Sequence, residues 1–458
     1  MKKRILSILL VVTMLAVMVP TFAVASGAET TVTDWDAEVI TLYTADDFKA
    51  FHDKCVAQKS FVGQTVKLGA DIDMSGNALS KYTGDTYGFN GTFDGQFHTL
   101  SNVSVSETVY HYTGALFGSI SAANSAVIKN LAVISSAFTH GRYSGVLYGD
   151  AHGALTVENV YLDVDMTVPD PYEVGGFVGR TDDDASSITF INCVFDGSIQ
   201  ANNSGRKFSP FMGLVNKGAV FSFTNCLIYG DFTRSYGNSV WTSAGKFICT
   251  NNSSADITYN DCIQYNDYYR IGEGMATAVC PELAGIDSGF GAFDTIAAED
   301  VPAGYTTLNT DYPVPTTLLP FFADKVNAVA AENGVTTEYY GYQDNGDMSA
   351  IRLIGLVHGD NEAFTSVGFE IEAVGPTGVT ASFTDDVKSV YTSVETPTGT
   401  KTAADLRADY IFVTEIGGIK ANSGVATFAV KTYSVDADGN KTYTDMYVVS
   451  FDTTVAAE

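Results

Sequence analysis

The sequence lacks the motifs of several common enzyme classes. It contains only six histidines and two tryptophans in 458 residues. It has no His-Glu-x-x-His pair to bind a catalytic zinc ion, no Gly-x-Ser-x-Gly turn to present a serine nucleophile, and no glycine-rich phosphate loop. These absences argue against a zinc metallopeptidase, an α/β-hydrolase and a P-loop nucleotidase.

Positive charge is also scarce. Lys and Arg number 25 against 53 Asp and Glu, which leaves a formal net charge of −28 at pH 7. Such a surface repels nucleic acids and anionic membranes, so we expect neither as a partner. The simplest interpretation of this acidity is solubility outside the cell.

Long apolar runs are confined to the N-terminus. Three cations at residues 2–4 precede an apolar run from Ile5 to Val19, and Ala23-Val-Ala25 is a small-residue cleavage site. These are the features of a secretory signal peptide over residues 1–25. No later stretch reaches the roughly 18 apolar residues of a membrane span. We therefore expect an extracellular protein, secreted or held non-covalently at the cell surface, without membrane insertion.

The middle of the chain repeats two markers that keep step with each other. One is a short apolar strand with a polar residue near its start, at Asn102, Asn130, Asn159, Asn192, Asn225 and Asp261. The other is a Gly-x-apolar-apolar-Gly unit, or a decayed form of it, upstream of each strand from the second onward. These units are Gly114–Gly118, Gly145–Gly149, Gly175–Gly179, Ser209–Gly213 and Trp241–Gly245.

Such a repeat predicts a parallel β-solenoid. Each copy is too short and too poor in helical periodicity to bury its apolar face alone, whereas stacked copies form a continuous core. Asn fits a repeated corner because it tolerates the left-handed backbone conformation and its amide can hydrogen-bond along the stack. The glycines would mark other corners.

The same units resemble the GLUG repeat. Residues 68–74 and 89–100 resemble the opening coils of secreted bacterial right-handed parallel β-helix proteins that carry this repeat. The resemblance covers roughly residues 40–280, although Phe97 stands where that family commonly has a second Gly. It implies a right-handed β-helix and an extracellular setting, but no single activity.

The predicted architecture is all-β. After the signal peptide we expect a parallel β-helix with an N-terminal cap over 26–300, a linker or C-terminal cap over 301–335, and an antiparallel, immunoglobulin-like β-sandwich over 336–458. The last region has alternating apolar strands and an Asp438-Gly439 hairpin turn, and it resembles a module appended to secreted proteins of Gram-positive anaerobes.

The predicted N-terminal cap is an amphipathic helix that begins after Thr44. Thr44 would act as its N-cap, Asp47 would favour the positive end of the helix dipole, and Phe48, Phe51 and Cys55 would share one face. A solenoid needs such a cover, because its first coil otherwise exposes an edge for pairing with other chains.

Three cysteines occupy the same place in successive repeats. Cys193, Cys226 and Cys262 directly follow the repeated polar residue. We expect inward-facing thiols rather than disulfides, because side chains that point in parallel give poor disulfide torsions. The pairing of the other cysteines is open.

Carboxylates are the first candidates for chemistry, because pectin-cleaving hydrolases of β-helix fold work with clustered Asp residues. Asp163 and Asp165 would face the same side of one strand, and Asp182, Asp183 and Asp184 follow one of the glycine units. Neither group has a His or a basic motif nearby in sequence. The acidic run is more simply a solvated loop, with a weak Ca²⁺ site as the alternative.

Aromatic residues precede the glycine units. If the coils stack in register, these side chains form a column along one flank on which sugar rings can stack, unless they pack beneath loops at the edge of the core. The candidates are Tyr112, Tyr143, Tyr172 and Phe208, with Tyr236 and Trp241 near the fifth unit and Arg142 beside Tyr143.

These features favour an adhesin-like binding protein over an enzyme. Its partner would be a glycan or a cell-surface protein, bound by the flank of the β-helix and with no cofactor beyond weakly held Ca²⁺. A polysaccharide lyase or glycoside hydrolase of β-helix fold is the alternative, with the five Asp residues as its catalytic candidates. The sequence leaves the ligand and the oligomeric state open.

Overall fold

The computed structural model describes most of the chain from residue 32 to residue 453. Within that span it leaves out 81, 83–87, 107–114, 140–142, 169–172, 182–185, 202–206, 216–218, 229–230, 235–247, 251–255, 266–290, 294–300, 310–312, 334–337, 345–347, 358–363, 388, 397–398 and 421–423. The predicted signal peptide lies outside the described residues. Among those residues, no helix has the length and apolar character needed to cross a bilayer.

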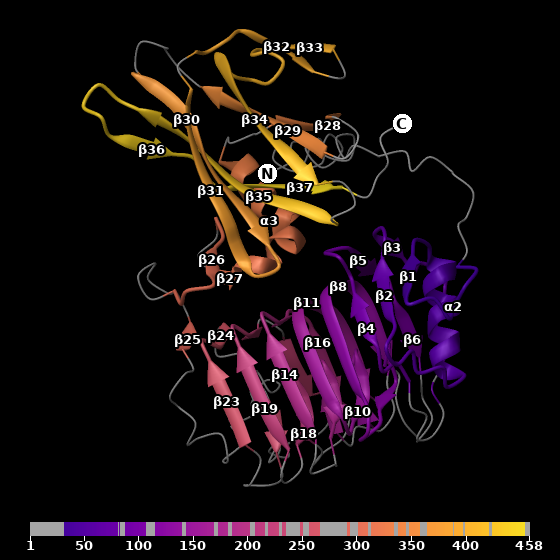
Figure 1. Ribbon diagram of the computed structural model, residues 1–458. Coiled ribbons are helices and arrows are strands. Elements are labelled where there is room, and N and C mark those ends of the chain that lie inside the picture. Colours follow the sequence, from indigo (N-terminus) through magenta and orange to yellow (C-terminus); the bar gives the residue numbers. More distant parts are fainter. Residues whose placement is uncertain are drawn as a thin grey trace, which may run out of the picture. The chain divides into compact units, whose positions relative to one another are not determined.

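The first part of the chain is the predicted parallel β-solenoid (Figure 1). Each strand of its main face pairs in parallel with its equivalent in the next coil; Thr156, for example, lies between Val127 and Thr189. The stacked strands are β1 (Val39–Leu42), β2 (Thr65–Leu68), β4 (Thr92–Asp94), β8 (Ser125–Thr139), β11 (Ala154–Val168), β14 (Ser187–Ile191), β19 (Val220–Thr224) and β23 (Asp256–Asn260).

Shorter strands complete the coils. Beyond the first corner they are β3 (Ile72–Asp73), β5 (Thr99–Ser101), β6 (Ser104–Ser106), β15 (Val194–Phe195), β16 (Ser198–Ala201), β20 (Leu227–Ile228), β21 (Asp231–Arg234), β24 (Ile263–Tyr265) and β25 (Gly291–Phe293). Two smaller parallel sheets close the other side. One contains β7 (Ser119–Ile120), β10 (Tyr148–Ala151), β13 (Val178–Arg180), β18 (Met212–Val215) and β22 (Ile248–Thr250), and the other β9 (Tyr143–Ser144), β12 (Glu173–Gly175) and β17 (Lys207–Ser209).

The repeated asparagines form the predicted corner and ladder. Asn130, Asn159, Asn192, Asn225 and Asp261 all have φ between 51° and 54°. From Asn159 to Asn225, each amide Nδ2 donates to Oδ1 of the residue one coil earlier, at 2.9 to 3.1 Å. The ladder begins at Asp94, whose Oδ1 accepts from Asn130 Nδ2 at 2.9 Å. We call this row the asparagine corner.

Asn102 does not belong to this row, and its assignment as the first repeat was wrong. Leu100 pairs with Val133, beyond the asparagine corner, and Asn102 donates to Asp73 instead, at 2.9 Å. The corner position of that coil is filled by Gln96 and Phe97, with φ of 50° and 64°. The Leu-Ser-Asn pattern resembled the later copies because Asn also serves the second corner.

The glycine units form a second set of tight, stacked turns. Leu147 N donates to Phe177 O at 3.0 Å and Phe117 N donates to Leu147 O at 2.9 Å, so the units lie one upon another. Glycine is required because a Cβ at Gly175 would lie 1.9 Å from the carbonyl oxygen of Val178. The central side chains, such as Phe177, are fully buried.

Helix α2 (Ala45–Val56) is the predicted cap of the first coil. Thr44 and Asp47 form a reciprocal capping box at its start. Phe51 is fully buried and lies against Phe89 and Phe93, with ring centroids 5.4 and 5.7 Å apart. The helix therefore extends the solenoid core instead of leaving its end open.

The four thiols whose side chains the structure describes are buried and unpaired, as predicted for the three in the repeat. Cys193, Cys226 and Cys262 line the solenoid core, and Cys55 lies beneath α2. Each thiol of the row donates to a backbone carbonyl two residues earlier, at 3.3 to 3.4 Å. Cys280 lies outside the described residues.

The C-terminal part has the predicted antiparallel sheets. One sheet contains β28 (Glu338–Asp344), β29 (Met348–Val357) and β34 (Tyr410–Lys420), and the other β30 (Ser366–Gly375), β31 (Gly378–Val387), β35 (Val425–Val435), β36 (Lys441–Tyr443) and β37 (Tyr447–Asp452). A separate hairpin joins β32 (Ser393–Thr396) and β33 (Gly399–Thr402). The predicted turn between β35 and β36 is present, and Gly439 has φ of 86°.

The connecting segment contains a helix that the sequence pattern did not predict. It comprises β26 (Tyr305–Thr307), β27 (Pro313–Pro315), the 3₁₀ turn η2 (Thr316–Leu318) and helix α3 (Leu319–Glu332). Helix α3 lacks a side-chain N-cap hydrogen bond, so the usual start signal is missing. We call everything from Gly304 to the end of β37 the C-terminal module.

The C-terminal module packs on a row of solenoid side chains just beyond the asparagine corner. Ala132, Tyr161, Val194 and Leu227 hold the same position in successive coils and share a buried cluster with residues of η2 and α3. Phe322 lies 4.7 Å from Tyr161, centroid to centroid. Burial of this row explains why outward-facing positions of the solenoid are apolar here.

Substitution of Asn159 tests the asparagine corner. Its Nδ2 donates to Asn130 Oδ1 and to Pro376 O, at 2.9 and 3.0 Å, and its Oδ1 accepts from Asn192 at 2.9 Å. Asn159→Ala should lower the free energy of unfolding by about 3 kcal/mol, through lost hydrogen bonds and a left-handed backbone. Denaturant unfolding measures the loss.

Asn159→Gly is the matched control. It loses the same hydrogen bonds but accepts φ of 54° without strain, so it should be less destabilised than the alanine variant, by about 1 kcal/mol. Equal stability of both variants and the wild type would contradict a structural role for the corner.

Alkylation tests the burial of the thiols. Burial raises the pKa of Cys55, Cys226 and Cys262, and only the thiolate reacts. In native protein, iodoacetamide should leave these three unmodified from pH 7 to pH 9.5, whereas an exposed thiol with a pKa of about 8.5 reacts increasingly fast. Peptide mass mapping, with denatured protein as the positive control, checks this; rapid native labelling would refute it.

Candidate functional site

The structure places Asp163 and Asp165 on β11. The register of β11 against β8 shifts between Leu162 and Val164, so Asp163 lies at the irregular point and Asp165 just beyond it. Asp165 is exposed and accepts a hydrogen bond from Ser198, whereas Asp163 is half-buried. Burial, and next the nearby charge of Asp196, raise the pKa of Asp163.

Asp163 has a basic neighbour that sequence proximity did not reveal. Lys325, on α3, places its Nζ 3.1 Å from Asp196 Oδ2 and 3.0 Å from the Tyr161 hydroxyl. The Tyr161 hydroxyl in turn donates to Asp196 at 2.8 Å. Lys325 and Asp196 are 129 residues apart in sequence, so no local motif could have predicted their contact.

This group, which we call the α3 cluster, has two physical consequences. It fastens α3 to the solenoid by the ion pair of Lys325 with Asp196 and by the hydrogen bond from Lys325 to the Tyr161 hydroxyl. It also holds a carboxyl of raised pKa beside a lysine and a tyrosine, a combination suited to proton transfer.

The acidic run Asp182 to Asp184 lies outside the described residues. Among the residues that the structure does describe, no group of three or more His, Cys, Asp or Glu is arranged to hold a metal ion. The weak Ca²⁺ site remains a prediction from the sequence.

Of the predicted aromatic column, the structure describes Tyr143 and the backbone of Phe208. These two do not share a register position, because Tyr143 lies opposite Glu173 and Phe208 opposite Val174. The column itself stays a prediction from the sequence. Tyr112, Arg142, Tyr172, Tyr236 and Trp241 lie outside the described residues.

Tyr143 instead belongs to a charged cluster. It is 7% exposed, and the Arg180 guanidinium lies 3.8 Å from its ring centroid. Arg180 donates through Nε to Asp150 Oδ2 at 2.8 Å, and its Nη2 lies 2.8 Å from the same oxygen. Glu173 Oε2 is 3.8 Å from Nη1. We call these residues, with His152, the flank cluster.

The flank cluster is deeply buried for a charged group. Asp150 and Glu173 are 3% and 4% exposed, and His152 Nε2 lies 3.3 Å from Asp150 Oδ1 at its more open edge. Desolvation of such charges offsets most of their attraction, so an ion pair of this kind contributes little net stability. Because stability does not account for this buried charged cluster, and because it lies on a flank built from successive coils, it is a candidate recognition site.

The flank cluster had a weak sequence signal. Glu173 and Arg180 bracket the Gly175–Gly179 unit, and Asp150 directly follows Gly149. The candidates predicted from the sequence at these units were the aromatic residues and Arg142 before them and the acidic run after Gly179. Charged residues that flank a predicted tight turn would have identified three members of the cluster.

Comparison with known proteins shows only distant similarity. No family model matches the chain. It is 28% identical over 188 residues to halomucin of Haloquadratum walsbyi (strain DSM 16790 / HBSQ001), which covers 35% of this chain and 2% of halomucin. This chain therefore corresponds to a small fraction of that relative.

This chain is also similar to a solved structure that is described as a candidate immunoglobulin A1 protease from Bacteroides ovatus, with 16% sequence identity and a TM-score of 0.40. The match covers 60% of this chain and 91% of the other. Neither comparison assigns a family or a ligand.

The pKa of Asp163 yields a test by pH. A carboxyl whose pKa is raised by folding binds its proton more tightly when folded, so it lowers the free energy of unfolding as pH rises above about 3.9, its unfolded-state value. Asp163→Asn should therefore raise Tm at pH 7 and leave it unchanged near pH 3. Thermal unfolding at both pH values checks this.

Asp165→Asn is the matched control, because Asp165 is exposed on the same strand. Its effect on stability should stay within about 0.5 kcal/mol at both pH values. A lower Tm for Asp163→Asn at pH 7 would show that the charged form stabilises the fold, against this interpretation.

Proposed function

We propose that this protein is a secreted or cell-surface binding protein that recognises glycans through the flank of its solenoid. The observation that carries this proposal is the flank cluster, in which successive coils hold a tyrosine ring, a guanidinium group and two carboxylates together. Carboxylates and guanidinium groups form directional hydrogen bonds with hydroxyl groups.

The solenoid scaffold supports this proposal physically. Parallel pairing fixes the strands on either side of the flank cluster, since Glu173 pairs with Tyr143 and Lys207. A site carried on stacked strands is held more rigidly than one on a loop, which reduces the entropy lost on binding. Stacked repeats also offer an extended surface to a long partner, and a cell-surface protein is therefore the alternative ligand.

A second candidate function is cleavage of a polysaccharide at the α3 cluster. The observation that favours it is the position of Asp163 beside the Lys325–Asp196 pair, where burial and the charge of Asp196 raise the pKa of its carboxyl, the direction that a general acid requires. Asp165 and Lys325 would be its neighbours in such a site. This activity and binding at the flank can be separated by experiment.

A glycan array with the full chain tests the binding proposal. Glu173→Gln keeps the shape of the side chain but removes its charge, and we expect at least a tenfold weaker signal on the glycans that the wild type binds. Glu372→Gln, an exposed position on β30, is the matched control and should bind as the wild type does. Melting curves confirm that each variant is folded.

Reducing-sugar and unsaturated-product assays on the same polysaccharides complete the test. Binding without product supports the adhesin-like function. Product release that Asp163→Asn abolishes would support the enzyme instead. The glycan proposal would be wrong if no glycan on the array bound, or if Glu173→Gln bound glycans like the wild type. A protein partner would then be the next candidate.

A further inference from the structure

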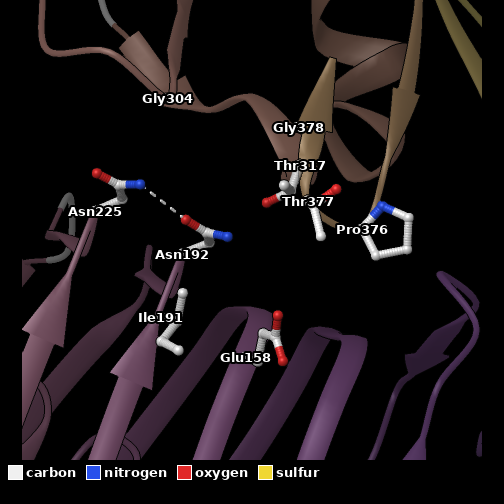
Figure 2. A pocket seen from close by; sticks show the side chains of 9 residues that line it. All are labelled: Glu158, Ile191, Asn192, Asn225, Gly304, Thr317, Pro376, Thr377 and Gly378. Carbon is white, nitrogen blue, oxygen red and sulfur yellow. Dashed lines mark hydrogen bonds between the residues drawn. The ribbon is translucent and has the colours of Figure 1, made fainter. Parts of the chain in front are cut away.

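A pocket of about 250 Å³ opens along the asparagine corner, where the C-terminal module packs on the solenoid (Figure 2). It is separate from both clusters described above. Its lining is Glu158, Ile191, Asn192 and Asn225 from the solenoid, and Gly304, Thr317, Pro376, Thr377 and Gly378 from the module.

The solenoid wall of the pocket presents hydrogen-bond acceptors. Asn225 donates its amide to Asn192 at 3.1 Å, drawn as a dashed line in Figure 2. The next corner residue is Asp261, a carboxylate without an N–H group, so it cannot donate to Asn225 Oδ1 and the ladder ends there. Glu158 adds a half-buried carboxylate, which forms no ion pair with any described residue.

The module wall presents hydroxyl groups. Thr317 is 4% exposed, and its Oγ1 has no hydrogen-bond partner among the described residues. A buried hydroxyl without a partner costs about 1 to 3 kcal/mol, so a native structure that keeps one calls for a missing partner. Figure 2 shows Thr317 and Thr377 across the pocket from Asn192 and Asn225.

The pocket is held open by the packing of its two walls. Asn159 Nδ2 donates to Pro376 O at 3.0 Å, which places the turn between β30 and β31 beside the ladder. At the other end, Gly304 lies so close that a Cβ there would be 2.8 Å from Asn225 Nδ2. The walls therefore meet at both ends and stay apart between them.

The lining selects the kind of ligand. Amide and carboxylate oxygens accept hydrogen bonds, Thr hydroxyls both donate and accept, and Ile191 and Pro376 offer small apolar contacts. None of the lining residues that the structure describes is a Lys, Arg or His, and Glu158 repels anions. The volume lies below the roughly 300 to 1,000 Å³ of sites for drug-sized ligands.

We propose that this pocket binds a single neutral sugar residue, whose hydroxyls satisfy Thr317, Glu158 and Asn225 together. The ligand is either a free monosaccharide or the terminal residue of a glycan. The inference goes beyond the proposed recognition at the flank and does not depend on it, because no residue is shared between the two sites.

Titration calorimetry with the full chain tests the pocket. The probes are glucose, galactose, mannose and N-acetylglucosamine, with galacturonate as the anionic comparator and short neutral oligosaccharides to distinguish a terminal residue from a free sugar. We expect one neutral sugar to bind and galacturonate to bind at least tenfold more weakly. Tighter binding of an oligosaccharide ending in that sugar identifies a glycan terminus.

Thr317→Val removes the unpartnered hydroxyl and keeps the shape of the side chain. It should preserve or raise Tm while weakening sugar binding at least tenfold, and Glu158→Gln provides a second variant should Thr317→Val fail to fold. Thr156→Val, on the outward face of β11, is the matched control and should bind as the wild type does.

Two results would overturn the proposal. They are no binding of any neutral sugar by the wild type, and undiminished binding by both Thr317→Val and Glu158→Gln. The two proposals fail in different patterns, because binding in the pocket depends on Thr317 and Glu158 and binding at the flank on Glu173.

Discussion

The asparagine in a left-handed corner is the interaction on which this structure depends. At each coil the chain must turn between two strands, and a positive φ makes that turn without breaking the parallel pairing on either side. Asparagine adopts that conformation at low cost and uses its side-chain amide to bond to the coil before it. A single residue type therefore sets both the bend within a coil and the spacing between coils.

The same corner also receives the C-terminal module. Pro376 accepts from Asn159, the Tyr305 hydroxyl donates to Asp261 O at 2.8 Å, and Val425 N donates to Gln96 O at 3.4 Å. Polar groups of the corner thus form hydrogen bonds with the C-terminal module. The apolar row just beyond the corner supplies the apolar surface that the module buries. Stacking of the solenoid and packing of the module are consequently coupled through one row of residues.

The module side of this contact also protects a strand edge. Asn309 and Asn327 each bond through both amide atoms to the backbone of one residue, Met446 and Val448 respectively, at 2.6 to 2.9 Å. These amides take the place of a neighbouring strand beside β37 and satisfy polar groups that would otherwise template pairing with another chain. Helix α3 therefore lies beside this sheet without leaving the backbone of Met446 and Val448 unpaired.

Charge is concentrated at two places that the repeat pattern does not specify. The flank cluster and the α3 cluster each contain one cation and two or more carboxylates, in a chain that is strongly acidic overall. In both, a cation sits where several carboxylates approach one another, which limits their mutual repulsion. The proposed recognition at the flank and the attachment of α3 therefore each depend on a single cation, Arg180 and Lys325 respectively.

The sequence by itself determined the features that repeat or that act locally. The period of the Asn residues, the thiols that follow them, the capping box of α2 and the hairpin at Asp438-Gly439 all follow from backbone preferences and spacing within one coil or one turn. Only the tertiary structure decided the register of Asn102, the pairing of Lys325 with Asp196, and the pocket beside Thr317. Each of these joins residues from different coils or from different parts of the chain, and the geometry of such contacts is set by packing, which no local pattern encodes.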